Sequence, residues 1–130
     1  MKKVYNWGIL APGKIAHKFV RDLSVLPNAR LHAVASRAPE RARVFAEQHG
    51  APHAFGSYEA MLSCPDLDVV YVATPHAFHH PNSLLFLRAG IPVLCEKPLA
   101  MNATQAQEMI ETARAQEVFL MEAMWTRYLP

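Results

Sequence analysis

Short apolar runs alternate with longer segments of helical periodicity along the chain, and this alternation limits the fold more than any other feature. The apolar runs, which we predict to be strands, are residues 4–10, 31–35, 53–55, 68–73, 92–95 and 118–121. The segments with helical patterning are residues 14–26, 39–49, 58–62, 81–89 and 103–113. Strands separated by helices pair in parallel through right-handed crossovers. The sequence therefore predicts an α/β fold with a doubly wound parallel sheet.

Two of the predicted helices carry clear apolar faces. The apolar residues of the segment 14–26 recur on one helical face, which consists of Ile15, Ala16, Phe19, Val20 and Leu23. The last helix follows Asn102, a good N-cap with Gln105 three residues on, as in a capping box. The apolar face of this last helix consists of Ala103, Ala106, Met109, Ile110 and Ala113.

The composition is that of one globular domain. The chain has 130 residues, of which 52% are hydrophobic and 18% charged, so it can bury a core. Its net charge is +2 and no block of like charges occurs, so we expect no nucleic-acid partner. No apolar run approaches the roughly 18 residues of a membrane span, and Asn6 interrupts a start that would otherwise suit a signal peptide. Cys64 and Cys95 make no disulfide framework, which favours the cytoplasm.

The turn after the first predicted strand carries a candidate phosphate-binding motif. Residues 11–16 match the dinucleotide fingerprint G-x-G-x-x-G/A, except that Ala11 replaces the first glycine. Gly13 would let the backbone approach a pyrophosphate at the helix N-terminus, whereas the alanine implies a turn without a strongly positive φ. The P-loop pattern also overlaps this turn, but Ile15 lacks the hydroxyl that such a loop offers to Mg²⁺. A plain strand–turn–helix is the remaining alternative.

The end of the second predicted strand bears on the choice of dinucleotide. An acidic residue about 20 positions after the fingerprint would bind the adenosine ribose of NAD, but here the strand ends in Ser36 and Arg37. A guanidinium pairs with a 2′-phosphate, and Arg41 lies one helical turn further on. This arrangement favours NADP over NAD, although NAD remains possible. The alternative is that Arg37 is an ordinary solvated arginine.

Two further strand ends carry polar residues. Thr74 and Pro75 follow the fourth strand, and His76, His79 and His80 come next with spacing that would place them on one helix face. A zinc site would need more ligands than these, so we predict no metal and regard the histidines as cofactor contacts or ordinary surface residues.

Glu96, Lys97 and Pro98 follow the fifth strand. In a crevice, a lysine can exchange a proton with a reacting hydroxyl. On the surface, Glu96 and Lys97 would be an ion pair of little consequence. Pro98 also admits a cis peptide bond.

These segments together resemble the Gfo/Idh/MocA oxidoreductase family. The resemblance rests on residues 7–16, 35–37, 72–76 with His79, and 95–100, in that order along the chain. Its most specific part is Glu96-Lys97-Pro98 at a fifth strand end. Residues 122–130 resemble the branch that contains dimeric dihydrodiol dehydrogenases and NADP-dependent D-xylose dehydrogenases.

The resemblance implies a Rossmann domain and hydride transfer between NADP and a secondary alcohol of a sugar or diol. Lys97 would touch the reacting hydroxyl as the catalytic residue. The implied cofactor-binding residues, together with Arg41 from the spacing above, are Gly13, Lys14, Ile15, Ser36, Arg37, Arg41, Tyr71, Thr74, Pro75, His79, Glu96, Lys97, Trp125 and Arg127. A module that binds or senses NAD(P) without catalysis is the alternative function.

The family also implies a second domain. We expect residues 1–123 to form the dinucleotide-binding domain and residues 124–130 to begin a linker toward a substrate domain that is absent from this chain. An apolar patch near Met124 and Trp125 would then favour self-association, which would produce a homo-oligomer. The sequence does not specify the substrate.

Overall fold

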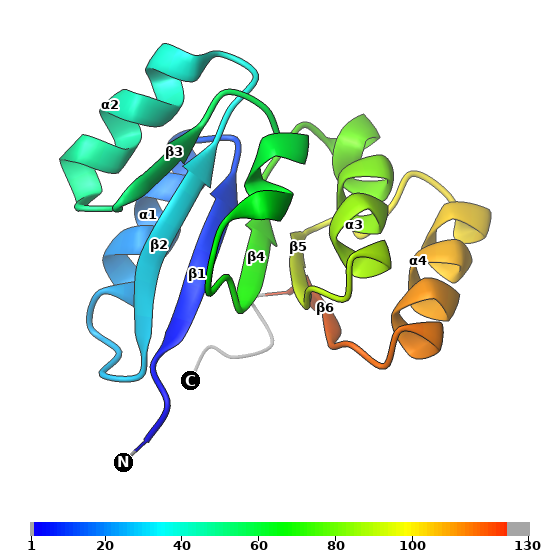
Figure 1. Cartoon of the computed structure of the whole chain (residues 1–130). Helices are drawn as coiled ribbons and strands as arrows, with labels where there is room; N and C mark the ends of the chain where they lie inside the picture. The colour runs from blue at the N-terminus through cyan, green and yellow to red at the C-terminus, as the bar shows by residue number, and fades with distance from the viewer. Residues whose placement is uncertain (1, 125–130) are drawn as a thin grey trace.

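The sheet has six strands that all run parallel. The structure is a computed structural model that describes residues 2–124. The strands are β1 (Tyr5–Leu10), β2 (Ala29–Ala35), β3 (His53–Phe55), β4 (Val69–Val72), β5 (Val93–Glu96) and β6 (Leu120–Ala123). Their order is β3-β2-β1-β4-β5-β6, and every neighbouring pair is parallel (Figure 1). The expected doubly wound sheet is therefore confirmed.

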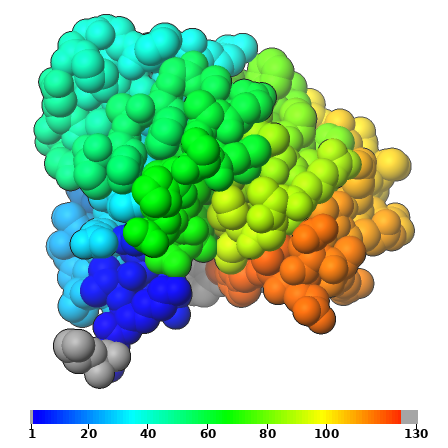
Figure 2. All heavy atoms as spheres, viewed as in Figure 1, coloured from blue at the N-terminus to red at the C-terminus, as the bar shows by residue number. Residues whose placement is uncertain are grey.

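Helices cover both faces of the sheet. They are α1 (Lys14–Leu23), α2 (Pro39–His49), α3 (His79–Arg88) and α4 (Ala103–Ala115), with short 3₁₀ helices η1 (Glu59–Ser63) and η2 (His76–Phe78). Residues of α1 and α2, such as Val20 and Phe45, bury one face, and residues of η1, α3 and α4, such as Met61 and Met109, bury the other. Figure 2 shows the atoms of α3 and α4 side by side on the surface. None of the helices within residues 2–124 is long and apolar enough to cross a bilayer.

Several predicted boundaries shift because local backbone contacts override the apolar pattern. The first helix ends at Leu23 rather than at 26, since Val25 and Leu26 donate only three residues back, to the carbonyls of Asp22 and Leu23. The third helix begins at His79 rather than at 81, because Pro81 is tolerated in a first helical turn. The sixth strand starts at Leu120 because the amide of Val118 donates to the end of α4.

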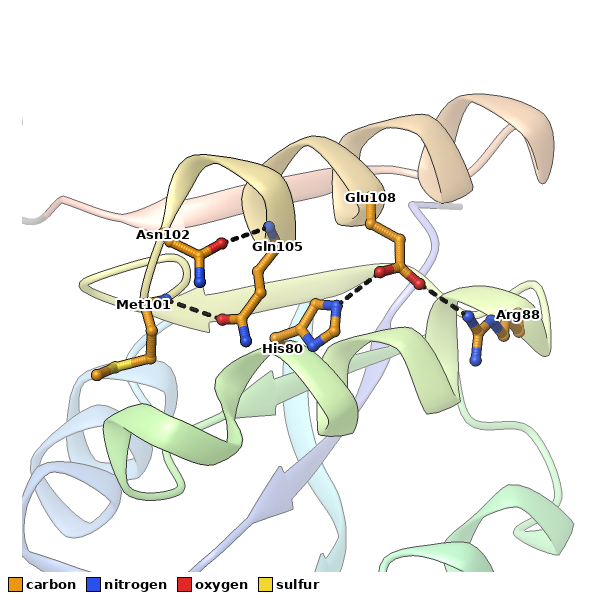
Figure 3. Close-up of polar contacts among 6 residues, drawn as sticks. All are labelled: His80, Arg88, Met101, Asn102, Gln105 and Glu108. Carbon is orange, nitrogen blue, oxygen red and sulfur yellow. Dashed lines mark hydrogen bonds and ion pairs between the residues drawn. The ribbon is translucent and has the colours of Figure 1, made fainter.

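The ends of other elements also shift: β2 begins at Ala29 rather than at 31, and α4 ends at Ala115 rather than at 113. The predicted helix 58–62 is the 3₁₀ helix η1, and the fourth and fifth strands shift by about one residue. The capping residue of α4 is confirmed, because the Asn102 side chain accepts from the Gln105 amide at 2.9 Å (Figure 3). The Gln105 side-chain oxygen accepts a hydrogen bond from the amide of Met101 at 3.1 Å, rather than from the amide of Asn102 as in a capping box.

The apolar faces of α1 and α4 are narrower than predicted. In α1, Ala16, Val20 and Leu23 are buried, but Ile15 is 41% exposed. In α4, Ile110 is 38% exposed and Ala103 lies at the surface, whereas Met109 and Ala113 are buried. Only Ala16, Val20 and Leu23 of α1, and Met109 and Ala113 of α4, are therefore part of the buried core.

The turn at Ala11 contradicts the sequence expectation. Its φ is +69°, in the left-handed region that the alanine was predicted to avoid. The Ala11 amide donates to Ala35 on β2 at 3.0 Å, and the Gly13 amide donates back to the Ala11 carbonyl at 2.9 Å. These bonds close a tight strand-to-helix turn, which a glycine would adopt without steric cost.

Ala11→Gly should therefore stabilise the protein. Relief of the left-handed strain outweighs the added entropy of the unfolded chain, so the free energy of unfolding should rise by about 0.5–1 kcal/mol. Denaturant titration measures this change. Ala103→Gly, at an exposed helical position, is the control and should lose stability. A loss of stability at both positions would contradict the strain at Ala11.

Candidate functional site

A cleft of about 740 Å³ opens at the carboxyl edge of the sheet, where β1 and β4 send their connections to opposite faces. This is the place where doubly wound sheets bind ligands. The predicted site residues that line the cleft are Gly13, Lys14, Ile15, Ser36, Arg37, Arg41, Thr74, Pro75, His79 and Glu96. Residues that are far apart in the sequence therefore meet in one cavity.

Two predicted site residues within the described part of the chain, Tyr71 and Lys97, do not line the cleft. Tyr71 is buried beneath it, on β4. Lys97 follows Glu96 and is exposed, outside the lining of the cleft. Trp125 and Arg127 lie outside the described residues.

Gly13 leaves the start of α1 open to the cleft. It is the N-cap of the helix, with φ −98° and no side-chain capping bond, and the first turn contains no acidic residue. The positive end of the helix dipole and its unpaired amides therefore remain available to an anion. A Cβ added at Gly13 would meet nothing within 4 Å, so neither packing nor φ requires glycine there. The open space suits a ligand that approaches the backbone closely, and a pyrophosphate fits it.

The far end of the cleft is cationic. Arg37 lies over the Phe78 ring at 5.5 Å, and neither Arg37 nor Arg41 forms an ion pair with any residue between 2 and 124. Ser36 is buried, and its Oγ accepts from the Ala38 amide at 3.1 Å, so its hydroxyl hydrogen is available to another acceptor. This end of the cleft is therefore suited to a phosphate group.

Tyr58 and Phe78 extend this end of the cleft, and the sequence analysis missed both. Burial raises the pKa of Tyr58, while the nearby Arg37 and Arg41 act in the opposite direction. Tyr58 therefore remains a neutral hydroxyl beside two cations. No local sequence signal would have found these residues, because Tyr58 directly precedes η1 and Phe78 ends η2, outside the strand ends that the motifs mark.

Thr74 is the polar group at the middle of the cleft. It is 4% exposed, and its Oγ1 has no hydrogen-bond partner among the residues that the structure describes. A buried hydroxyl without a partner costs stability. A ligand oxygen in the cleft would satisfy Thr74, so the donor set fits a ribose or phosphate group.

The predicted histidines do not form one cluster. His79 is fully buried; its Nε2 lies 2.8 Å from the Thr74 carbonyl oxygen and its Nδ1 lies 2.7 Å from the Pro98 carbonyl oxygen. It therefore links the segments that follow β4 and β5. His80 points away and shares the carboxylate of Glu108 with Arg88, at 3.0 and 3.1 Å, which joins α3 to α4 (Figure 3). His76 is exposed.

Long-range contacts orient the end of β5. The Tyr71 hydroxyl donates to the Glu96 carboxylate, and its ring stacks on Phe19 at 3.9 Å. Burial, followed by the Glu96 carboxylate, raises the pKa of Tyr71, which stays protonated. Glu122 on β6 accepts from the Leu99 amide at 2.7 Å, just after the cis Lys97–Pro98 bond. The sequence analysis missed Glu122, because nothing in its neighbours marks a partner 23 residues away.

The fold and this cleft define a Rossmann dinucleotide-binding domain. The family model described as "Oxidoreductase family, NAD-binding Rossmann fold" matches residues 5–124, so the chain belongs to the Gfo/Idh/MocA oxidoreductase family. The chain is 50% identical over 127 residues to trans-1,2-dihydrobenzene-1,2-diol dehydrogenase of Xenopus tropicalis, and 51% identical over 128 residues to that of Danio rerio. The alignment with each relative includes 96% of this chain but only 38% of the relative's own length.

Solved structures agree with this assignment. The structure of KijD10, a 3-ketoreductase from Actinomadura kijaniata in complex with TDP-benzene and NADP, matches 98% of this chain with a TM-score of 0.93 and 32% identity. A probable dehydrogenase from Thermotoga maritima matches 95% with a TM-score of 0.89 and 25% identity. This chain covers 40% and 37% of those two chains.

Tyr71→Phe should destabilise the protein while it keeps the ring stacked on Phe19. The substitution removes the hydrogen bond to a carboxylate, and we expect a loss of about 1.5–3 kcal/mol in the free energy of unfolding. Urea titration measures the loss. Tyr58→Phe is the control, because the Tyr58 hydroxyl has no hydrogen-bond partner between residues 2 and 124, and it should change stability by less than about 0.5 kcal/mol. Equal effects would contradict the role of the Tyr71–Glu96 contact.

Proposed function

We propose that this chain is the NADP-binding domain of an oxidoreductase that transfers a hydride between NADP and a secondary alcohol of a diol or sugar. The observation that carries the proposal is the presence of two guanidinium groups, Arg37 and Arg41, at the end of the cleft beside Ser36, with no ion-pair partner between residues 2 and 124. The dihydrodiol dehydrogenase names of the relatives, and the NADP with which the KijD10 ketoreductase was crystallised, support it. Residues 1–123 would form this domain, and residues 124–130 would begin a linker to a substrate domain.

The cofactor would lie along the cleft with its charged groups at the two positions described above. The backbone from Gly13 to Ile15 would hold the pyrophosphate, and Ser36, Arg37 and Arg41 would hold the adenosine 2′-phosphate. Thr74 would donate to a ribose or phosphate oxygen through its hydroxyl, which no described residue engages, with Pro75 beside it. His79 would position Thr74, because its ring nitrogen lies 2.8 Å from the Thr74 carbonyl oxygen.

The reacting end would be at the β5 terminus. Bound NADP would supply the hydride acceptor. Glu96, oriented by Tyr71, would border the nicotinamide ribose, and the exposed Lys97 would hold and exchange the proton of the substrate hydroxyl. Trp125 and Arg127 would border the nicotinamide and the substrate. We also propose a cytoplasmic location, because both cysteines are free, buried thiols. The partners would be a small-molecule substrate and, through self-association near Met124, a second copy of the chain. We propose no nucleic-acid partner.

Arg37→Ala tests the choice of dinucleotide. It removes a charged hydrogen bond to the 2′-phosphate, so NADPH binding should weaken by about 1.5–3 kcal/mol while NADH binding changes little. Isothermal calorimetry with both dinucleotides measures the difference. Arg114→Ala, on the exposed last turn of α4, is the matched control and should leave both affinities unchanged. Equal losses for NADPH and NADH would exclude the 2′-phosphate role of Arg37.

Lys97→Met tests the proton step. In a two-domain enzyme made by joining this chain to the remainder of a dihydrodiol dehydrogenase, kcat should fall about 10²–10⁴-fold, because the general acid–base group is gone. NADPH affinity should change far less. An enzyme that keeps its kcat after this substitution would leave Lys97 and Glu96 as a surface ion pair without a role in the proton step.

A further inference from the structure

Three side chains of types that can bind a metal lie close together, away from the dinucleotide cleft. They are His32 on β2, His53 at the start of β3, and Cys64, which directly follows η1. One ligand atom from each lies within 4.8 Å of the others, the one such group in the described part of the chain. None of the three lines the cleft described above.

A β-bulge places His32 in this group. Leu31 pairs with Trp7 and Ala33 pairs with Gly8, so His32 is an extra residue in the ladder between β1 and β2. Bulges redirect a side chain relative to the regular alternation of a strand. The His32 ring accordingly reaches the segment after η1, where its Nε2 lies 2.7 Å from the Pro65 carbonyl oxygen.

The hydrogen bond to Pro65 sets the tautomer of His32. A carbonyl oxygen only accepts, so Nε2 carries the hydrogen and Nδ1 keeps the lone pair. A ring that donates one N–H to a backbone carbonyl is the usual arrangement for a metal-ligating histidine. The His53 ring lies 4.7 Å from that of His32 at an angle of 67°, so the two rings are not stacked face to face.

We propose that His32, His53 and Cys64 bind one zinc ion, with water as the fourth ligand. Two imidazoles and one thiolate suit zinc better than the hard cations Mg²⁺ and Ca²⁺. Donor atoms in a tetrahedral zinc site lie roughly 3.5 Å apart, so small side-chain rotations bring the three ligands together. Coordination replaces the hydrogen of the Cys64 thiol, and that proton passes to solvent.

The environment fits an ion that enters from one side. His32 and Cys64 are 7% and 8% exposed, whereas His53 is half-buried and borders a solvent-open cleft along α1 and β2. The ion would join β2 and β3 to the segment after η1. The site would be separate from the dinucleotide cleft.

Cobalt and zinc titrations of the whole chain test this proposal. Co²⁺ should bind one ion per chain and give a thiolate-to-cobalt charge-transfer band, which Cys64→Ser abolishes and Cys95→Ser retains. Zinc should raise the melting temperature, and His53→Gln should weaken zinc binding at least tenfold, in line with the cost of disturbing a metal site. His80→Gln is the matched histidine control and should bind zinc as the unaltered chain does.

Two results of the metal titrations would overturn the proposal. One is cobalt binding without a thiolate band. The other is zinc binding that survives His53→Gln but disappears in His49→Gln, because the His17 and His49 rings, with nitrogens 2.7 Å apart, would then be the site. If Cys64→Ser does not fold, thiol labelling of the unaltered chain without added dinucleotide replaces that variant. Zinc should then slow the reaction of Cys64 with N-ethylmaleimide. Equal labelling with and without zinc would contradict the site.

Discussion

The position of β1 between β2 and β4 is the constraint on which the rest of the molecule depends. Hydrogen bonds continue both ladders past the strand: the Ala11 amide donates to Ala35, and the Ala73 amide donates to Leu10. The chain leaves β1 toward one face and β4 toward the other, so the carboxyl edge opens between their connections. The glycine turn, the Ser36–Arg37 segment and Thr74 then meet because each follows a strand of the same sheet.

Polar contacts between distant elements make this edge rigid. The Tyr71 hydroxyl donates to Glu96, the Glu122 carboxylate accepts from the Leu99 amide, and the His79 ring lies between the carbonyl oxygens of Thr74 and Pro98. Three strands and the start of α3 therefore fix the backbone around Lys97, although its own side chain is exposed. An exposed lysine on a fixed backbone suits a residue that would act on a substrate held by another domain, because a catalytic group needs a defined position more than it needs burial.

The sequence predicted the fold well because the strands and helices differ in local pattern. All six strands, their parallel pairing and most of the residues that line the cleft follow from apolar periodicity and from what comes after each strand. The left-handed turn at Ala11 was missed, since the tightness of the turn overrides the preference of alanine. Tyr58, Glu122 and the His32 group were missed for another reason: their partners lie far away in the sequence, and a bulge such as that at His32 leaves no periodic signal.

The cleft is also where the chain carries costs that its own fold does not require. Gly13 forgoes a side chain that its φ and surroundings would allow, and the Thr74 hydroxyl lacks a partner within residues 2–124. Each of these features lowers the stability of the domain by itself. Both become favourable if an anion with ribose-like oxygens lies against the start of α1, because it would use the open backbone and satisfy the hydroxyl. Local costs that share one ligand as their remedy are better evidence for a binding site than the glycine motif alone.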